Sequence, residues 1–264
     1  MAKKKYKFLN IGTGQNIWQV PRNTQAYLML DPAVCNLQKI VVHNHTVLHL
    51  FCFYQFEQAD NISFNLKIYL KNEAKAIITQ CYFGGQSVQA DCGLVFEGQY
   101  SSADLNVLYF ADQKQVFDFK FGAEFLAPNN KSKILIKGIV KDEAKVKVDG
   151  TISIGESAKA SDASLAEHAL NLSRRASVRH LPVLKIDTND VKAVHAASVS
   201  KLNDEDVFYL KSRGLPEPLA EKILIASFLK NVYMNQEHLE DYFCKIDEMI
   251  EGKLKIENEK SISL

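Results

Sequence analysis

The sequence contains none of the short motifs that mark common catalytic sites. A Gly-x-Ser-x-Gly nucleophile elbow, a Walker A loop, a His-Glu-x-x-His zinc motif and a Cys-x-x-Cys pair are all absent from the 264 residues. The carboxylates are spread along the chain and do not gather in one segment. We therefore expect a scaffold or assembly protein and not an enzyme.

An excess of charge and a long apolar run are also lacking. The formal net charge is +1, from 32 basic and 31 acidic residues, which gives no reason to expect binding to nucleic acid or to an anionic membrane surface. No apolar run reaches the ~20 residues that are needed to cross a bilayer. The N-terminal segment has no apolar region of the signal-peptide kind. These features predict a cytoplasmic protein.

Cysteine is scarce, and its spacing is irregular. There are five cysteines, at positions 35, 52, 81, 92 and 244. An odd number of scattered cysteines does not indicate a disulfide framework. We expect each of them to be a small, buried, reduced side chain.

What the sequence does contain is a series of short segments in which apolar and polar residues alternate. Between residues 39 and 154, apolar side chains recur at every second position, as in Ile62–Leu70 and Phe117–Phe121, and turn-forming residues separate the segments. A period of two is typical of strands with one buried face. A β-sandwich and a β-solenoid both fit this pattern, and periodicity alone does not choose between them.

After residue 202 the apolar residues change to a helical period. Asn203 is a predicted N-cap, and Gly214 is a predicted left-handed residue just beyond the helix end. Pro216 suits the start of the next helix. We predict helices over 203–211, 216–232 and 236–251, followed by a frayed tail over 253–264.

The stretch from Asn189 to Phe228 joins the strand-like part of the sequence to the helical part, and it carries a family resemblance. In the family the pattern is roughly D-D-V-x-C-S-H-G-A-T-V-G, followed by F-Y-L-R-S-R-G-I-P. The matching segments here are Asn189-Asp190-Val191, His195-Ala196-Ala197-Ser198-Val199-Ser200, Phe208-Tyr209-Leu210-Lys211-Ser212-Arg213-Gly214-Leu215-Pro216 and, upstream, Ala169-Leu170-Asn171-Leu172-Ser173. They resemble the core of the SufB/SufD family of iron–sulfur cluster assembly proteins, and SufD more than SufB.

The resemblance implies a fold and a division into parts. It favours a mainly β protein, a right-handed parallel β-helix with a C-terminal α-helical subdomain. The expected β-helix core covers residues 1–200, with the first 38 less well defined by the pattern. The helical subdomain covers 201–252. The N-terminal helical region of longer SufD proteins is absent, so a short form is expected.

The resemblance also implies partners. SufD-like proteins pair with SufB-like proteins through their β-helices, and their helical C-terminal part docks a SufC-type ATPase. The expected ATPase contacts are Phe208, Tyr209, Arg213, Gly214 and Leu215, with Phe208 the most suited of them to be core. The expected pairing edge includes Val183, Leu184, Ile186, Val191 and Ala193, within a strand-like run that begins at Val183 and continues to Ala193. An isolated chain would form a homodimer through the same edge.

His195 takes the place of the family histidine that helps to hold a nascent iron–sulfur cluster at the subunit interface. We expect it to be an iron ligand of a transient cluster shared with a partner chain, with no cofactor bound tightly by this chain alone. Two departures matter: Ala193 replaces a family cysteine, and Ala196 replaces a family glycine. They keep open a second interpretation, a structural partner of the same complex that has lost cluster chemistry.

A rival from another class is a β-helix that binds or acts on carbohydrate. Its only support is a set of tyrosines, Tyr69, Tyr82 and Tyr109, which would have to line one exposed face.

The remaining histidines allow two further hypotheses. His43 and His45 are two apart, on one face of a predicted strand, with His49 nearby. A metal site there is possible, but histidines without metal are favoured because no cysteine or carboxylate accompanies them locally. His168, His180 and His195 are spaced by about one predicted coil each, so they could form a ladder.

Overall fold

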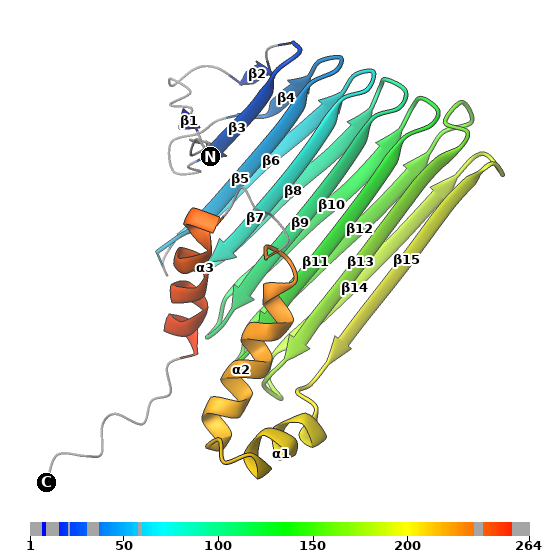
Figure 1. The fold of residues 1–264 in the computed structure, drawn as a ribbon. Helices are drawn as coiled ribbons and strands as arrows, with labels where there is room; N and C mark the ends of the chain where they lie inside the picture. Colours follow the sequence, from blue (N-terminus) through cyan, green and yellow to red (C-terminus); the bar gives the residue numbers. More distant parts are fainter. Residues whose placement is uncertain are drawn as a thin grey trace, which may run out of the picture.

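The computed structural model describes residues 7–8, 16–20, 22–30, 37–57, 60–234 and 240–254. The chain forms a parallel β-solenoid with three helices after it (Figure 1). The predicted mainly β architecture is therefore confirmed, and the sandwich alternative is wrong. No helix in the described ranges is long and apolar enough to cross a bilayer.

The strands alternate between two sheets. Sheet A holds the odd-numbered strands in sequence order: β1 (Lys7–Phe8), β3 (Gln25–Leu30), β5 (Val47–Gln55), β7 (Lys75–Phe83), β9 (Ser102–Ala111), β11 (Lys131–Val140), β13 (Ser161–Asn171) and β15 (Val191–Ser200). Sheet B holds the even-numbered strands: β2 (Ile17–Val20), β4 (Lys39–Val42), β6 (Asn61–Leu70), β8 (Ser87–Phe96), β10 (Val116–Phe125), β12 (Lys145–Ile154) and β14 (Ser177–Ile186). Each coil thus contributes one strand to each sheet.

The ladder register fixes the length of a coil. Val116 pairs with Lys145, and Ser161 pairs with Val191, so equivalent positions in adjacent coils are 29 and 30 residues apart. All of these pairings are parallel. A side chain that faces inward in one coil therefore stacks on an inward side chain of the next coil.

The space between the two sheets is filled by the inward row of every strand. Phe117, Phe119 and Phe121, which alternate with polar residues in the sequence, are all buried there. Tyr82 and Tyr109 lie in the same interior and are fully buried. The carbohydrate hypothesis needed these two tyrosines on an exposed face, so the structure removes its support.

Helices cover the outer face of sheet A, while the described strands of sheet B are not covered (Figure 1). The helices are α1 (Asp204–Ser212), α2 (Glu217–Lys230) and α3 (Glu240–Lys253). A second apolar core forms between sheet A and the helices, and includes Phe51, Phe83, Phe110, Ile225, Leu229 and Ile246. Lys137 Nζ also donates to the Phe228 carbonyl at 3.0 Å, which ties α2 to β11.

Local signals predicted the helix ends well. The Asn203 side chain accepts a hydrogen bond from the backbone N–H of Glu205, as an N-cap does, and Gly214 adopts φ +92°. The expectation that Phe208 belongs to the core is wrong. Phe208 is 72% exposed and its neighbour Val207 is the buried residue of α1, because this short helix contacts the rest of the protein along one narrow face.

Some predictions fall outside the described residues. The predicted start of the last helix at 236 lies within 235–239, and most of the predicted tail lies within 255–264; Cys35 is also outside. The strand-like run expected from Val183 to Ala193 is wrong as one segment. The chain turns after Ile186, so β14 lies in sheet B and β15, which starts at Val191, lies in sheet A.

Candidate functional site: the open end of the solenoid

The last coil leaves one end of the solenoid without a neighbouring coil. Strand β15 is the last strand of sheet A and β14 the last strand of sheet B, and both lie at the end opposite the first coils (Figure 1). Their outer edges have no pairing partner among the described strands. We call the inward-facing side chains of these two strands the open end: Val178, His180, Pro182, Leu184 and Ile186 on β14, and Val191, Ala193, His195, Ala197 and Val199 on β15.

The open end is an unfinished core. Leu184 is 43% exposed and Val199 is 47% exposed, although their ladder partners in the preceding coil, Ile152 and Ala169, are buried. Of the predicted pairing residues, Ile186 is exposed, and Val191 and Ala193 are half-buried against the main core. Val183 is exposed but faces outward. Apolar side chains arranged to continue a core present a surface that another chain can cover.

His195 belongs to the inward row of the open end. Its ladder partner is Leu165, a core residue, so the imidazole faces the interior, and its side chain is 16% exposed. Burial lowers the pKa of His195. The neutral imidazole that results is the form that binds a metal ion.

Glu167 lies beside His195, one coil further in. Its side chain is fully buried, and its Oε2 is 3.8 Å from His195 Nε2. The carboxylate crosses the interior toward β12, where Gly150 makes room for it: a Cβ at position 150 would stand 2.0 Å from Glu167 Oε1. Burial, with a smaller contribution from Asp149, raises the pKa of Glu167 to about 7.

Glu167 is not among the site residues predicted from the sequence. A signal was available, because Ala163, Leu165, Glu167 and Ala169 occupy alternate positions of one strand, and three of the four are apolar. A carboxylate at an inward position of such a strand marks a site that needs an explanation.

The last coils contain two further histidines, His168 and His180. The predicted ladder of His168, His180 and His195 on one face is wrong. His180 lies on β14, across the interior from sheet A, and burial together with His168 and His195 lowers its pKa to about 4. His168 faces outward from β13, where its Nδ1 lies 2.7 Å from Ser198 Oγ. The spacings of 12 and 15 residues correspond to half a coil, so successive histidines fall on different sheets.

The first three histidines do not form a site either. His43 and His45 lie in the turn between β4 and β5 and not on one strand face. His43 Nε2 lies 3.0 Å from Gln19 Oε1, and His45 Nδ1 lies 3.1 Å from Glu73 Oε2. His49 stacks on Tyr27. Each ring therefore has a different neighbour.

The described cysteines offer no ligand near the open end. Cys52, Cys81 and Cys92 are buried in earlier coils, and burial raises the pKa of the last two thiols. The prediction of a buried side chain is wrong for Cys244, which is exposed on α3. Among the described residues, no group of three histidine, cysteine, aspartate or glutamate side chains is close enough to hold a metal ion. A complete site would therefore need ligands from outside these residues.

The predicted ATPase contacts lie together at the junction of α1 and α2. Phe208 and Tyr209 are both exposed. The Arg213 guanidinium lies 5.3 Å from the centroid of the Tyr209 ring, which places a cation on an exposed aromatic face. Gly214 and Leu215 follow in the turn that leads to α2. The result is an exposed aromatic and basic surface on one compact helical corner.

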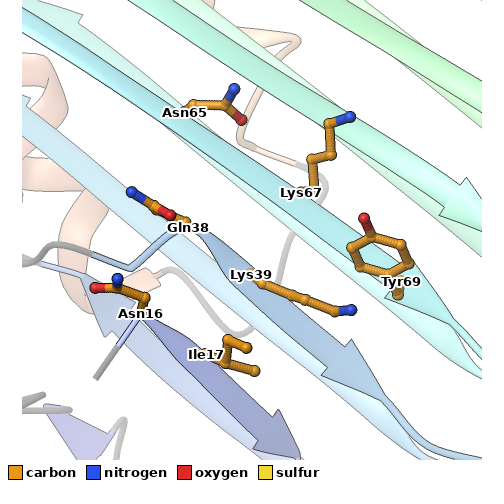
Figure 2. Close-up of a pocket in the computed structure, with 7 residues that line it drawn as sticks. All are labelled: Asn16, Ile17, Gln38, Lys39, Asn65, Lys67 and Tyr69. Atoms are coloured by element: carbon orange, nitrogen blue, oxygen red, sulfur yellow. The ribbon is translucent and has the colours of Figure 1, made fainter. Parts of the chain in front are cut away.

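A third feature lies far from the open end. Figure 2 shows a hollow on sheet B near the first coils, lined by Asn16, Ile17, Gln38, Lys39, Asn65, Lys67 and Tyr69. Lys39 Nζ lies 4.1 Å from the centroid of the Tyr69 ring. Tyr69, the third tyrosine of the carbohydrate hypothesis, is half-buried, so none of the three is fully exposed. Its charged lining residues are two lysines, Lys39 and Lys67, and no carboxylate lies among them. The hollow shares no residue with the open end.

Comparison with known proteins identifies the family. The family model described as "SUF system FeS cluster assembly, SufBD core domain" matches residues 24–228, which covers the described solenoid from β3 onward together with α1 and most of α2. The chain belongs to the SufBD core family. The resemblance seen in the sequence around His195 is thereby confirmed for the greater part of the chain.

Individual SufBD relatives match the chain over shorter ranges. The iron–sulfur cluster assembly protein SufD of Escherichia coli is 28% identical over 159 residues, which are 60% of this chain and 38% of the relative. A SufBD family protein of Mycobacterium tuberculosis is 32% identical over 157 residues, 56% of this chain and 40% of the relative. SufD of Bacillus subtilis is 36% identical over 122 residues, 46% of this chain and 28% of the relative. The matched region thus spans less than half the length of these curated relatives.

Proposed function

We propose that this SufBD-family chain is a SufD-like scaffold subunit for iron–sulfur cluster assembly. In this proposal the open end pairs with a SufB-like protein, and the α1–α2 corner docks a SufC-type ATPase. The observation that carries the proposal is the unfinished core of the last coil. It combines two strand edges that pair with no described strand, exposed apolar side chains and an inward histidine at one end of the solenoid.

Pairing at the open end would continue both sheets across a subunit interface. An open strand edge is a template for another strand, and a partner with a similar end would cover Leu184, Ile186 and Val199. The same surface on a second copy of this chain would be self-complementary about a two-fold axis, which accounts for the expected homodimer of the isolated protein. In either pair, His195 would come to lie at the interface.

His195 would then hold the nascent cluster together with ligands from the partner. The cluster is the cargo of the scaffold and not a resident group. An imidazole is a weaker ligand for iron in a cluster than a thiolate, so a mixed ligand set favours release. Ala193 faces the same interior as His195 and adds no thiol, while Ala196 faces outward from β15. The replaced glycine is therefore on the opposite face of the strand from the proposed ligand.

Replacement of Leu184 by glutamate is expected to abolish pairing without unfolding the chain. The side chain is 43% exposed in the single chain, so the charge meets water there, whereas in a pair it would be buried in an apolar interface. We expect at least a tenfold weaker association with the co-expressed SufB-like protein, measured by co-purification and analytical ultracentrifugation. The isolated variant should sediment as a monomer.

Val116→Glu is the matched control, because Val116 is exposed to a similar extent but lies on sheet B in the middle of the solenoid. It should pair like the natural protein. If Leu184→Glu pairs as tightly as Val116→Glu, the open end is not the pairing surface and the proposed assembly is wrong.

Replacement of Arg213 by glutamate is expected to weaken docking of the ATPase. The guanidinium is exposed at the end of α1 and stacks on Tyr209, so the change reverses a surface charge and leaves the core untouched. We expect about a tenfold loss of affinity, equivalent to ~1.4 kcal/mol, in a pull-down titration or by calorimetry. Lys114→Glu makes the same charge change on an exposed turn between β9 and β10. Equal binding by the two variants would count against the α1–α2 corner.

A further inference from the structure

Glu167 is costly to the fold, because no hydrogen bond from the described residues compensates for its burial. The residue is fully buried, and neither carboxylate oxygen has a hydrogen-bond partner among the described residues. A buried polar group without a partner destabilises a protein, and a carboxylate does so more than a neutral group. Its neighbours in the inward row of β13 are Leu165 and Ala169, which are apolar. A buried glutamate at this position is therefore best explained by a bound group that interacts with its carboxylate.

The nearest polar atom faces Glu167 and is also unpartnered. His195 Nε2 is buried and makes no hydrogen bond to any described residue, and its distance of 3.8 Å from Glu167 Oε2 is too long for one. Both ring nitrogens of His180, on the opposite sheet, are also buried and have no hydrogen-bond partner in the described part of the chain. Three polar side chains in the inward rows of the last two coils thus carry buried atoms without a hydrogen-bond partner among the described residues.

The separation of the two atoms suits a shared metal ion. Nitrogen and oxygen ligands lie ~2.1 Å from a first-row divalent ion, so two of them at a tetrahedral angle are about 3.4 Å apart. The observed distance of 3.8 Å between His195 Nε2 and Glu167 Oε2 is about 0.4 Å longer than this value. A hydrogen-bonded pair would instead lie at about 2.8 Å. The geometry is thus nearer to that of two ligands of one ion.

We infer that Glu167 is a second ligand from this chain, and that its carboxylate and the His195 imidazole bind one divalent transition-metal ion such as Fe²⁺ at the open end. This inference deepens the proposed function, because it rests on the same histidine and makes the open end a half-site for iron. One carboxylate and one imidazole leave coordination positions free, so the partner chain or water supplies the remaining ligands. An imidazole–carboxylate set also favours iron as a single divalent ion.

The test uses Co²⁺ as a spectroscopic substitute for Fe²⁺ and the full isolated chain. Binding is followed by visible absorption and by the paramagnetic shifts of the histidine ring protons. We expect saturable binding that shifts the His195 signals, with at least a tenfold weaker midpoint in both Glu167→Gln and His195→Ala. Glu167→Asp keeps the charge on a shorter side chain and should lose less than Glu167→Gln. Glu124→Gln removes an exposed carboxylate from sheet B and should bind like the natural chain.

Several results would overturn the inference. They are a Glu167→Gln midpoint within twofold of the natural chain, an unchanged midpoint in His195→Ala, or the absence of saturable binding up to millimolar Co²⁺. The thermal midpoint of Glu167→Gln checks the fold, and it should not fall, since the change removes a buried ionisable group. Co-purification with the SufB-like protein and the ATPase is measured in parallel. If the chain binds Co²⁺ but does not pair, Glu167 and His195 remain the ligands and the proposed function is wrong. If the chain pairs but does not bind Co²⁺, the proposed function stands and the inferred metal site is wrong.

Discussion

Replacement of His195 by alanine is expected to abolish cluster accumulation on the assembled complex while leaving the fold and the pairing intact. The fold should survive because His195 lies in the last coil and its Nε2 makes no hydrogen bond to the described residues. Pairing should survive because Leu184, Ile186 and Val199 remain in place. Cluster accumulation should fall to background because the proposed site loses the imidazole that this chain contributes.

The measurement is anaerobic reconstitution of the co-purified complex, followed by visible absorption and by iron and sulfide content per complex. His168→Ala is the matched control. His168 lies in the same part of the solenoid, yet it faces outward and contacts Ser198, so its loss should leave cluster yield unchanged. If the His195→Ala complex pairs and accumulates as much cluster as the complex of the natural chain, the alternative of a structural partner without cluster chemistry is supported.

Replacement of Gly138 by alanine is expected to destabilise the solenoid strongly. The ring of Tyr109 lies flat against Gly138 in the next coil, and an added Cβ would stand 1.9 Å from its Cζ and within 2.3 Å of both Cε atoms. Tyr109 is fully buried, and its ring packs against Phe119 at a centroid distance of 5.6 Å, so it has no free space to move into. Overpacking of this kind costs roughly 3 kcal/mol of unfolding free energy or more.

Chemical denaturation monitored by far-UV circular dichroism would measure this loss as a lower midpoint. Gly93→Ala is the control, since a Cβ there meets only Lys67 Cγ at 3.8 Å, and alanine is favoured over glycine in a strand by roughly 0.5–1 kcal/mol. Tyr109→Leu combined with Gly138→Ala should recover part of the stability that Gly138→Ala loses, because the shorter side chain leaves room for the methyl group. A Gly138→Ala midpoint equal to that of Gly93→Ala would contradict the packing described here.

The open end also explains why the candidate site was only half visible in the sequence. His195 was found because its neighbours match a family pattern. In the structure, Glu167 Oε2 lies 3.8 Å from His195 Nε2. Glu167 was not predicted, because it is 28 residues earlier in the chain. That separation is about one coil, and coil length is set by the ladder register and not by any local signal. The predicted ladder of His168, His180 and His195 was wrong for the same reason. It assumed coils of 12 to 15 residues, whereas the coils are about 30 residues long.

The direction in which a residue faces was the other recurrent difficulty. Alternation shows that two sets of side chains face opposite ways, but in a solenoid the outer set can also be buried, as it is under α2 and α3. Tyr82 and Tyr109 were therefore assigned to a possible exposed groove when they belong to the interior. In α1 the prediction placed Phe208 in the core, but Val207 is the buried residue, because a helix of two and a half turns has too few apolar residues to define a face.

The sequence by itself determined the properties that depend on near neighbours along the chain. These are the period-two strands, the helix cap at Asn203, the left-handed turn at Gly214 and the family pattern around His195, all of which follow from local backbone and side-chain preferences. The family pattern also implied a parallel β-helix. Only the tertiary structure decided that its coils form two sheets with an open last coil, and that Glu167 faces His195 there. Such contacts join residues about 30 positions apart, and their pairing depends on the packing of whole coils, which no local pattern of residues specifies.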